Sequence, residues 1–464
     1  MANSDGDTGG TSELLRGIAA LRRQLSSSSP TTAGASPSFA SSPLLSPTTR
    51  QQYTDPPVIL DIGARGIRAG IAGMERPVCE IPIGPDLRGR IKTNVLWDLD
   101  ARNTSIEDVL DILQTILRDI YYKYLLLDGK SRKVVILENP MMTLQLKKAI
   151  AFVLFNYFQS ISVTYMLSPV GSMLAAGART ALVVDIGWHE TTVTPIFDYK
   201  PILSATRSTL RAGKRLHDLV SRTLKAFTDA IPSFDEVEEF IARAMYCSPV
   251  DLSTSATTSQ QAFAITLSGN TYYIPSSETR HKPLMQLFLQ RAEDNVDDID
   301  DFPIHDLIVS CLSGLGIDTR ASMLSRIIFV GGCSNIPGLT LRILEEVRNC
   351  LAPDSAGGDS TDLYLQKNFR PWTIGDRSRI KAITSLGAWS GASLYISRER
   401  DHLLNGTGAG AGTIRRIRAE TASGISHTAS SSFRILGEVE RDLFLLDKNY
   451  ADNIFDWTIS TKYR

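Results

Sequence analysis

The chain of 464 residues has few cysteines and no excess of either charge. Its five cysteines are scattered, and no CxxC pair or cysteine–histidine cluster occurs, which argues against a disulfide framework and a structural zinc site. Lysine and arginine total 49 while aspartate and glutamate total 50, so the charge offers no support for binding nucleic acid or an anionic membrane. We therefore expect no nucleic-acid partner.

Long apolar runs are also missing. No stretch of about 18 apolar residues occurs, so we expect no membrane span. The first residues contain no apolar signal core, and unpaired cysteines are typical of a reducing compartment. These absences together favour a cytoplasmic location.

Two segments have compositions that do not support a packed core. Residues 1–56 are dominated by Ser, Thr, Pro, Gly and Ala, and residues 405–432 are of similarly low complexity. Such segments bury too little apolar surface to offset the entropy cost of ordering. We predict a disordered tail at 1–56 and a mobile loop at 405–432.

One stretch of the tail is different. The sequence ELLRGIAALRRQL at 13–25 places Leu14, Ile18, Leu21 and Leu25 near one helical face. Two interpretations stay open. The segment is either a nascent helix with no fixed role or a docking helix for a partner.

From Pro57 onward, strand patterns alternate with helix patterns. Apolar periodicity predicts helices that begin near Ser105 and that cover 144–158, 170–177, 212–227, 235–246, 284–293, 338–350 and 385–397. Buried strands are predicted at 133–138 and 163–167, and 248–280 fits short strands or a loop. This alternation predicts an α/β fold with parallel or mixed sheets and helices on their faces.

A short sequence motif occurs twice, and a third, related motif follows later in the chain. VILDIG at 58–63 and LVVDIG at 182–187 are each a buried strand that runs into Asp-Ile-Gly, followed by a hairpin partner. IIFVGGCSNIPGL at 327–339 is a third buried strand, and it ends in a Gly-Gly turn. Glycine at such strand ends lets backbone amides approach a phosphate. Two facing hairpins and a Gly-Gly turn are the parts of a nucleotide cleft between two related domains.

Each part has a predicted role in binding a nucleoside phosphate. The carboxylates Asp61 and Asp185 would hold a divalent cation through water. Arg68 would supply a cation for the phosphates, and Cys333 lies in the turn beside the adenosine. The backbone positions of the three turns are Gly63, Ala64, Arg65, Gly187, Gly331 and Gly332.

These motifs resemble those of the actin superfamily, specifically its actin-related proteins. The resemblance runs from Val58 to about Ile396 through four signatures: DIGARGIRAGIAG, MLAAGARTALVVDIGWHETTVTP, FVGGCSNIPGL and AWSGASL. It implies an actin-like ATPase fold of two related domains, each a mixed five-stranded sheet flanked by helices, around ATP or ADP with Mg²⁺. The implied domains are 57–168 with 388–464, and 169–387. The turn at Gly213 and Lys214 resembles the family's turn near the ribose.

Several family residues are replaced. Ala64 and Arg65 stand where the family has Ser-Gly, and two interpretations of Arg65 stay open: a distorted turn without nucleotide, or a guanidinium that contacts phosphate. Trp188 stands where the family has a metal-organising aspartate, and His189 where it has a glycine. Ser168 aligns with the family's hydrolytic glutamine.

The adenine-bordering Lys-Glu pair of the family is replaced by Ala242 and Arg243. Water positioning and metal coordination are therefore both impaired. We expect a pseudo-ATPase that binds nucleotide statically or not at all, so the cofactor can be absent.

The stretch from Gly73 to Pro140 is shorter than the actin pattern, which would reduce the small outer subdomain. An actin-like body that adds to a filament but offers no further contact surface is a cap. The chain resembles the fungal actin-related proteins at the pointed end of dynactin. That resemblance implies a cytoskeletal protein in dynein-dependent, microtubule-based transport, with a filament-forming actin-related protein and other pointed-end subunits as partners. The alternatives are a nuclear subunit of a chromatin-remodelling complex and an active actin-like ATPase.

Overall fold

The computed structural model describes residues 55–83, 97, 106–130, 132–249, 262–291, 301–351, 379–405 and 437–446. The tail predicted at 1–56 and the loop predicted at 405–432 lie almost wholly outside these residues, as do residues 84–96 and 98–105 of the shortened stretch from Gly73 to Pro140. The chain divides into two compact units: unit 1 is Met1–Leu167 with Ala392–Arg464, and unit 2 is Ser168–Gly391. Each unit is described by itself.

Unit 1 is built on a mixed sheet. Among the described residues it has six strands in the order β13-β5-β4-β1-β2-β3. The strands β1, β4 and β5 are parallel, whereas β2, β3 and β13 pair antiparallel with their neighbours. Their bounds are β1 Val58–Ile62, β2 Gly66–Ile71, β3 Cys79–Pro82, β4 Lys133–Glu138, β5 Ser162–Leu167 and β13 Gly437–Glu440.

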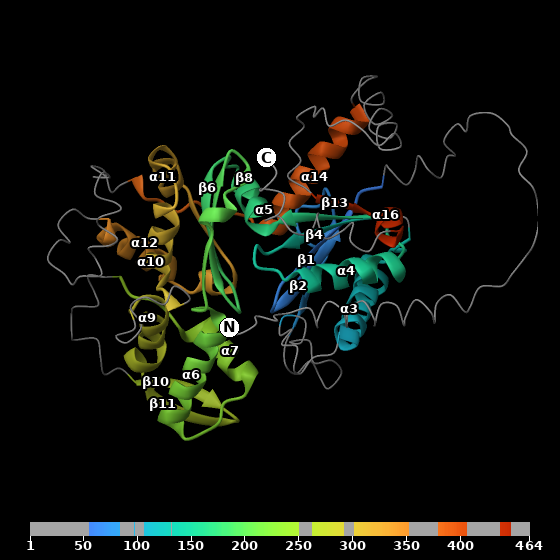
Figure 1. The fold of residues 1–464 in the computed structure, drawn as a ribbon. Coiled ribbons are helices and arrows are strands. Elements are labelled where there is room, and N and C mark those ends of the chain that lie inside the picture. Colours follow the sequence, from blue (N-terminus) through green and yellow to red (C-terminus); the bar gives the residue numbers. More distant parts are fainter. Residues whose placement is uncertain are drawn as a thin grey trace, which may run out of the picture. The chain divides into compact units, whose positions relative to one another are not determined.

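Two helices cover one face of this sheet (Figure 1). Helices α3 (Ile106–Asp119) and α4 (Leu144–Asn156) lie side by side and bury their apolar stripes against alternate residues of β1, β4 and β5. A π-helical turn, η2 (Ile120–Leu125), follows α3, and the short helix α16 (Arg441–Leu446) follows β13. At the end of β4 the fully buried Glu138 pairs with Lys147 of α4 at 2.7 Å. This ion pair fixes α4 to the sheet.

Unit 2 repeats the plan. Its mixed sheet has the order β12-β6-β7-β8, with β9 also paired to β7. Strands β6 and β12 are parallel, and β6 and β7 form an antiparallel hairpin like that of β1 and β2. The bounds are β6 Ala181–Ile186, β7 Thr191–Phe197, β8 Lys200–Pro201, β9 Arg207–Thr209 and β12 Ile327–Val330. A separate hairpin, β10 (Ala262–Leu267) with β11 (Asn270–Pro275), settles the open assignment of 248–280 in part.

The helices of unit 2 enclose a second apolar core. A capping box at Ser233 and Glu236 starts one of them, α7. Short π and 3₁₀ turns, η3 (Leu203–Ala205), η4 (Ser277–His281) and η6 (Gly332–Asn335), connect the elements. The helices are α5 Ser168–Ala175, α6 Gly213–Thr228, α7 Phe234–Ala244, α9 Lys282–Phe288, α10 Ile304–Ser313, α11 Ile317–Leu324 and α12 Leu339–Cys350.

The last long helix, α14 (Ala388–Asn405), begins in unit 2 and continues in unit 1. Its small residues permit close packing, as the sequence predicts. A Cβ added at Gly391 would lie 1.8 Å from the carbonyl oxygen of Gly171 on α5, so only glycine fits at this crossing.

Most predicted elements are confirmed to within a few residues, and the α/β fold with two mixed sheets is confirmed. Three helices, α10, α11 and α16, were not predicted. Helix α10 is buried nearly all round, so it lacks the apolar stripe on which the prediction depends. The sheet of unit 1 has one strand more than expected, because β13 adds to β5 from far along the sequence.

Candidate functional site

The two Asp-Ile-Gly phrases form the same turn in their separate units. The amide of Gly63 donates to the carbonyl oxygen of Gly66 at 3.0 Å, and that of Gly187 donates to Glu190 at 3.1 Å. A Cβ added at either glycine would lie 2.9 Å from the carbonyl oxygen that accepts its hydrogen bond. Both turns therefore need glycine for close backbone approach, and both leave an aspartate near the strand end.

In unit 1 the predicted cation already has two carboxylate partners. Arg68 Nη1 lies 3.4 Å from Asp61 Oδ2, and Arg68 Nη2 lies 2.9 Å from Glu80 Oε1. Burial raises the pKa of Asp61, and the opposing effect of Arg68 is smaller. The guanidinium is thus placed to neutralise unit 1's own carboxylates, which weakens its attraction for an added phosphate.

Arg65 is engaged by the end of strand β3. Its Nη1 donates to the carbonyl oxygen of Ile83, and the amide of Ile83 donates back to the Arg65 carbonyl at 3.0 Å. The first contact engages the guanidinium within the chain and the second fixes the backbone, which favours a turn that is complete without a phosphate. A contact between Arg65 and phosphate, the second interpretation, stays a prediction. Ala64 lies beside it, half-buried in the same turn.

Unit 2 brings most of its predicted site residues together. The amides of Gly213 and Lys214 donate to the carbonyl oxygens of Gly187 and Trp188 at 2.9 and 2.8 Å. A Cβ added at Gly331 would lie 2.5 Å from Asp185 Oδ1, and one added at Gly213 would lie 3.2 Å from Cys333 Sγ. Gly332 begins the turn η6 next to them.

The same contacts decide how well the loops of unit 2 fit a nucleotide. The two amides of the Gly213–Lys214 turn already donate to the neighbouring loop, so they do not add to a phosphate cradle. The turn fits a cation better than a phosphate, because Asp185 and Glu190 both contribute a carboxylate to it. Asp185 would be its ligand in unit 2, and Asp61 is the predicted ligand in unit 1.

Trp188 is built into an aromatic cluster of unit 2. Its ring centroid lies 5.8 Å from those of His217 on α6 and Phe234 at the start of α7, which stack on each other at 4.2 Å. His217 Nε2 also lies 3.2 Å from the Phe234 carbonyl oxygen. The indole therefore anchors its loop to two helices, in the position where the family carries a metal-organising carboxylate.

Glu190 was not among the predicted site residues. Burial, and secondarily the charge of Asp185, raise its pKa to about 7. Glu190 follows Asp185 by five residues in the same turn. That spacing in the sequence was the signal that could have identified it. His217 and Phe234 were also missed, because only the folded chain brings them to Trp188.

The remaining replaced positions lie on helices. Ser168 begins α5, and its carbonyl oxygen accepts a hydrogen bond from Ser172 Oγ at 3.1 Å. Ala242 and Arg243 are in the last turn of α7, where Arg243 is exposed and pairs with Glu239.

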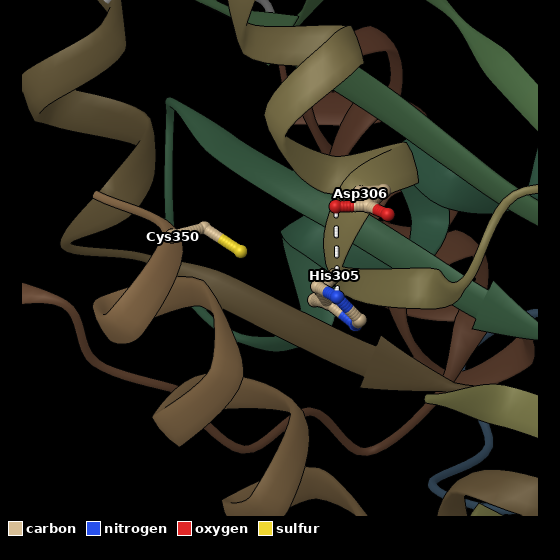
Figure 2. A group of neighbouring side chains, drawn as sticks. All are labelled: His305, Asp306 and Cys350. Atoms are coloured by element: carbon tan, nitrogen blue, oxygen red, sulfur yellow. Dashed lines mark ion pairs between the residues drawn. The ribbon is translucent and has the colours of Figure 1, made fainter. Parts of the chain in front are cut away.

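A further group of possible metal ligands lies in unit 2. Figure 2 shows His305 and Asp306 of α10 facing Cys350 at the end of α12. One ligand atom from each residue lies within 4.8 Å of the others, and His305 Nε2 lies 3.5 Å from Asp306 Oδ1. Burial lowers the pKa of His305, so its imidazole is neutral near pH 7.

The carboxylate of this group is already bound. Arg291 Nε donates to Asp306 Oδ2 at 2.8 Å, and Arg291 Nη2 donates to Asp306 Oδ1 at 2.9 Å. A bidentate guanidinium satisfies the negative charge that a metal ion would need, and it repels a second cation. We therefore interpret the group as a buried ion pair with a neutral histidine beside it.

Comparisons with known proteins agree with this fold. The protein-family model described as Actin matches residues 53–264. Actin-related protein 2 of Saccharomyces cerevisiae is 24% identical over 327 residues, which cover 63% of this chain and 81% of the relative. Actin-related protein 2 of Arabidopsis thaliana is 22% identical over 289 residues, covering 60% of this chain and 71% of the relative.

A third relative is a different actin-related protein. Actin-related protein 10 of Dictyostelium discoideum is 24% identical over 212 residues. These residues cover 41% of this chain and 44% of the relative, so the chain spans less than half of that protein.

Two mixed sheets, each with a strand–Asp-x-Gly–strand hairpin, define an actin-like α/β protein. The actin domain matched over 53–264 and the actin-related relatives support a divergent actin-related protein of the actin superfamily. No helix in the described part of the chain is long and apolar enough to cross a membrane.

The raised pKa of Glu190 predicts a pH-dependent stability. Its value of about 7 exceeds the ordinary 4.5, so the folded chain holds this proton more tightly than the unfolded chain does. The free energy of unfolding should therefore fall as the pH rises from about 4.5 to about 7. Above pH 7, Glu190→Gln should be more stable than the unchanged chain by up to roughly 3 kcal/mol. Near pH 4.5 the two should be equal.

Denaturant unfolding of both proteins between pH 4.5 and pH 8 measures this difference. A Glu190→Gln variant that is less stable at pH 8 would contradict the prediction, and it would indicate that the carboxylate is held by a cation.

The group around Asp306 gives a second prediction. Asp306→Asn should lower the free energy of unfolding by about 2–3 kcal/mol, because Arg291 loses its bidentate partner. Cys350→Ser should lower it by less than about 1 kcal/mol, since the thiol is only half-buried and is not needed by the ion pair. Thermal and denaturant unfolding check both, with and without a chelator.

A metal site would behave in the opposite way. Cys350→Ser would then be as damaging as Asp306→Asn, and the chelator would lower the melting temperature of the unchanged chain only.

Proposed function

We propose that this chain is a structural, non-hydrolysing actin-related protein that caps the pointed end of the short actin-related filament in dynactin. In that role it supports dynein-dependent transport and is associated with the cytoskeleton. Nucleotide is bound statically or not at all. The proposal has two parts, the loss of hydrolysis and the capping role, and different observations support them.

The observation that carries the first part is the anchoring of Trp188. Phosphoryl transfer depends on positioned water and on a cation that balances the developing charge. The indole packs on His217 and Phe234, so it has a structural partner set that a metal-organising carboxylate would not have. Ser168, in the position of the hydrolytic glutamine, is too short to hold a water over a γ-phosphate.

Unit 1 supports the same conclusion through charge. Arg68 is shared between Asp61 and Glu80, and Arg65 is held by Ile83. A phosphate would have to compete with these partners. Binding should therefore be weak unless the nucleotide replaces one of them.

The capping role is supported by sequence rather than by the site. The stretch from Gly73 to Pro140 is shorter than the actin pattern, and one relative is an actin-related protein 10. Filaments grow through head-to-tail contacts, so an actin-like body that lacks one of the two surfaces ends the filament. The partners would be the filament-forming actin-related protein and the other pointed-end subunits.

Affinity capture of the tagged full chain from its own cells tests the capping role. We expect mass spectrometry to find the filament-forming actin-related protein and the other dynactin subunits in near-stoichiometric amounts. Glu190→Gln, which alters only the nucleotide loop, should recover the same partners, because capping depends on the outer surfaces.

Recovery of a chromatin-remodelling ATPase with its nuclear subunits would contradict the proposal and establish the alternative. Recovery of neither set of partners would also contradict it.

A further inference from the structure

An apolar surface on unit 1 has no covering element among the described residues. It consists of Tyr122, Tyr124 and Leu126, whose exposed fractions are 58%, 48% and 79%. We call these three side chains the η2 surface. Their sequence neighbours Tyr121 and Leu125 are buried in the core of unit 1, so the turn has one face inside and one outside. Such a concentration of exposed apolar side chains marks an interaction site.

The backbone of this surface is unusual in two respects. Residues Ile120–Leu125 form a π-helical turn, a rare element that is frequent at functional sites. Leu126 then adopts the left-handed conformation, with φ of 52° and ψ of 42°, which is unfavourable for a bulky residue. The chain thus holds a leucine in a strained conformation that leaves its side chain in solvent.

The described part of unit 1 begins close to the chain segment that carries this surface. Asp55, the first described residue, lies 3.7 Å from Arg132 Nη2 through its Oδ2. Arg132 follows Leu126 by six residues, and the amide of Leu127 donates to the carbonyl oxygen of Tyr121 at 2.9 Å. Asp55 is therefore tied to the segment that continues from the η2 surface.

The tail contains a segment whose pattern matches such a surface. Residues 13–25 place four aliphatic side chains on one helical face and carry Arg16, Arg22 and Arg23. A helix this short is only marginally stable alone in water, so it needs an apolar partner. A linker with the length of residues 26–54 would span roughly 30 Å and would keep the segment at about millimolar effective concentration.

We propose that residues 13–25 dock as an amphipathic helix on the η2 surface of the same molecule. The tail then covers Tyr122, Tyr124 and Leu126, and a partner that uses this surface must first displace it. This inference depends on neither the nucleotide loops nor the capping role.

Hydrogen exchange of the full chain tests the docking. We expect the amides of 13–25 to exchange at least about tenfold more slowly than in an unstructured chain. Two variants should abolish this protection: Ile18→Asp with Leu21→Asp in the tail, and Tyr124→Ser with Leu126→Gly on the surface. The second variant is compatible with the fold, because glycine adopts the left-handed conformation without strain.

A matched control uses another exposed apolar pair. Phe227→Ser with Ile231→Ser removes side chains that are 45% and 77% exposed in unit 2, and it should leave the protection of 13–25 unchanged. Trypsin cleavage after Arg16, Arg22 and Arg23 should accelerate about tenfold in the tail and surface variants and not in the control.

Three results would overturn the proposal. The first is unprotected exchange of 13–25 in the unchanged chain. The second is protection that survives the surface variant. The third is protection that depends on protein concentration, which would indicate a second copy as the occupant.

Discussion

The close approach of backbone at Gly63 and at Gly187 is the constraint on which the rest of this structure depends. In each unit a glycine amide bonds to a carbonyl oxygen across a tight turn, and a Cβ would come within 2.9 Å of that oxygen. The turn joins two adjacent strands of the sheet, and it sets the register in which Asp61 faces Arg68 and Asp185 faces Thr192. The helices of each unit pack on the sheet that contains its hairpin.

The backbone of the two turns resembles the actin pattern, whereas the side chains around them differ from it. The carboxylates Asp61 and Asp185 stand near the strand ends, but the groups around them serve the protein itself. Arg68 neutralises Asp61 and Glu80, Trp188 packs on two helices, and the amides of the Gly213 turn bond to the adjoining loop. A site whose donors are already engaged is stable without a ligand. That is the physical reason for interpreting the chain as a structural member of its superfamily.

Local patterns predicted the elements that have one buried face. The hairpins at 58–71 and 181–197, the stripe of α3 and the small residues of α14 were all evident in the sequence. Patterns failed where burial is uniform or where contacts are distant in sequence. Helix α10 has no polar face, strand β13 pairs with β5 from the other end of the chain, and the rings beside Trp188 come from α6 and α7. The engagement of Arg65 and Arg68 could not be predicted either, because their partners Ile83 and Glu80 are set by the pairing of β2 with β3.

Phosphate release from Mg-ATP by the purified full chain, measured beside an Asp185→Ala variant, tests the central claim most directly. The account predicts that the unchanged chain releases no phosphate above background and that the variant is indistinguishable from it. Sustained release that disappears with Asp185→Ala would contradict the account, because it would mean that the loop anchored by Trp188 still organises a metal ion and a water molecule.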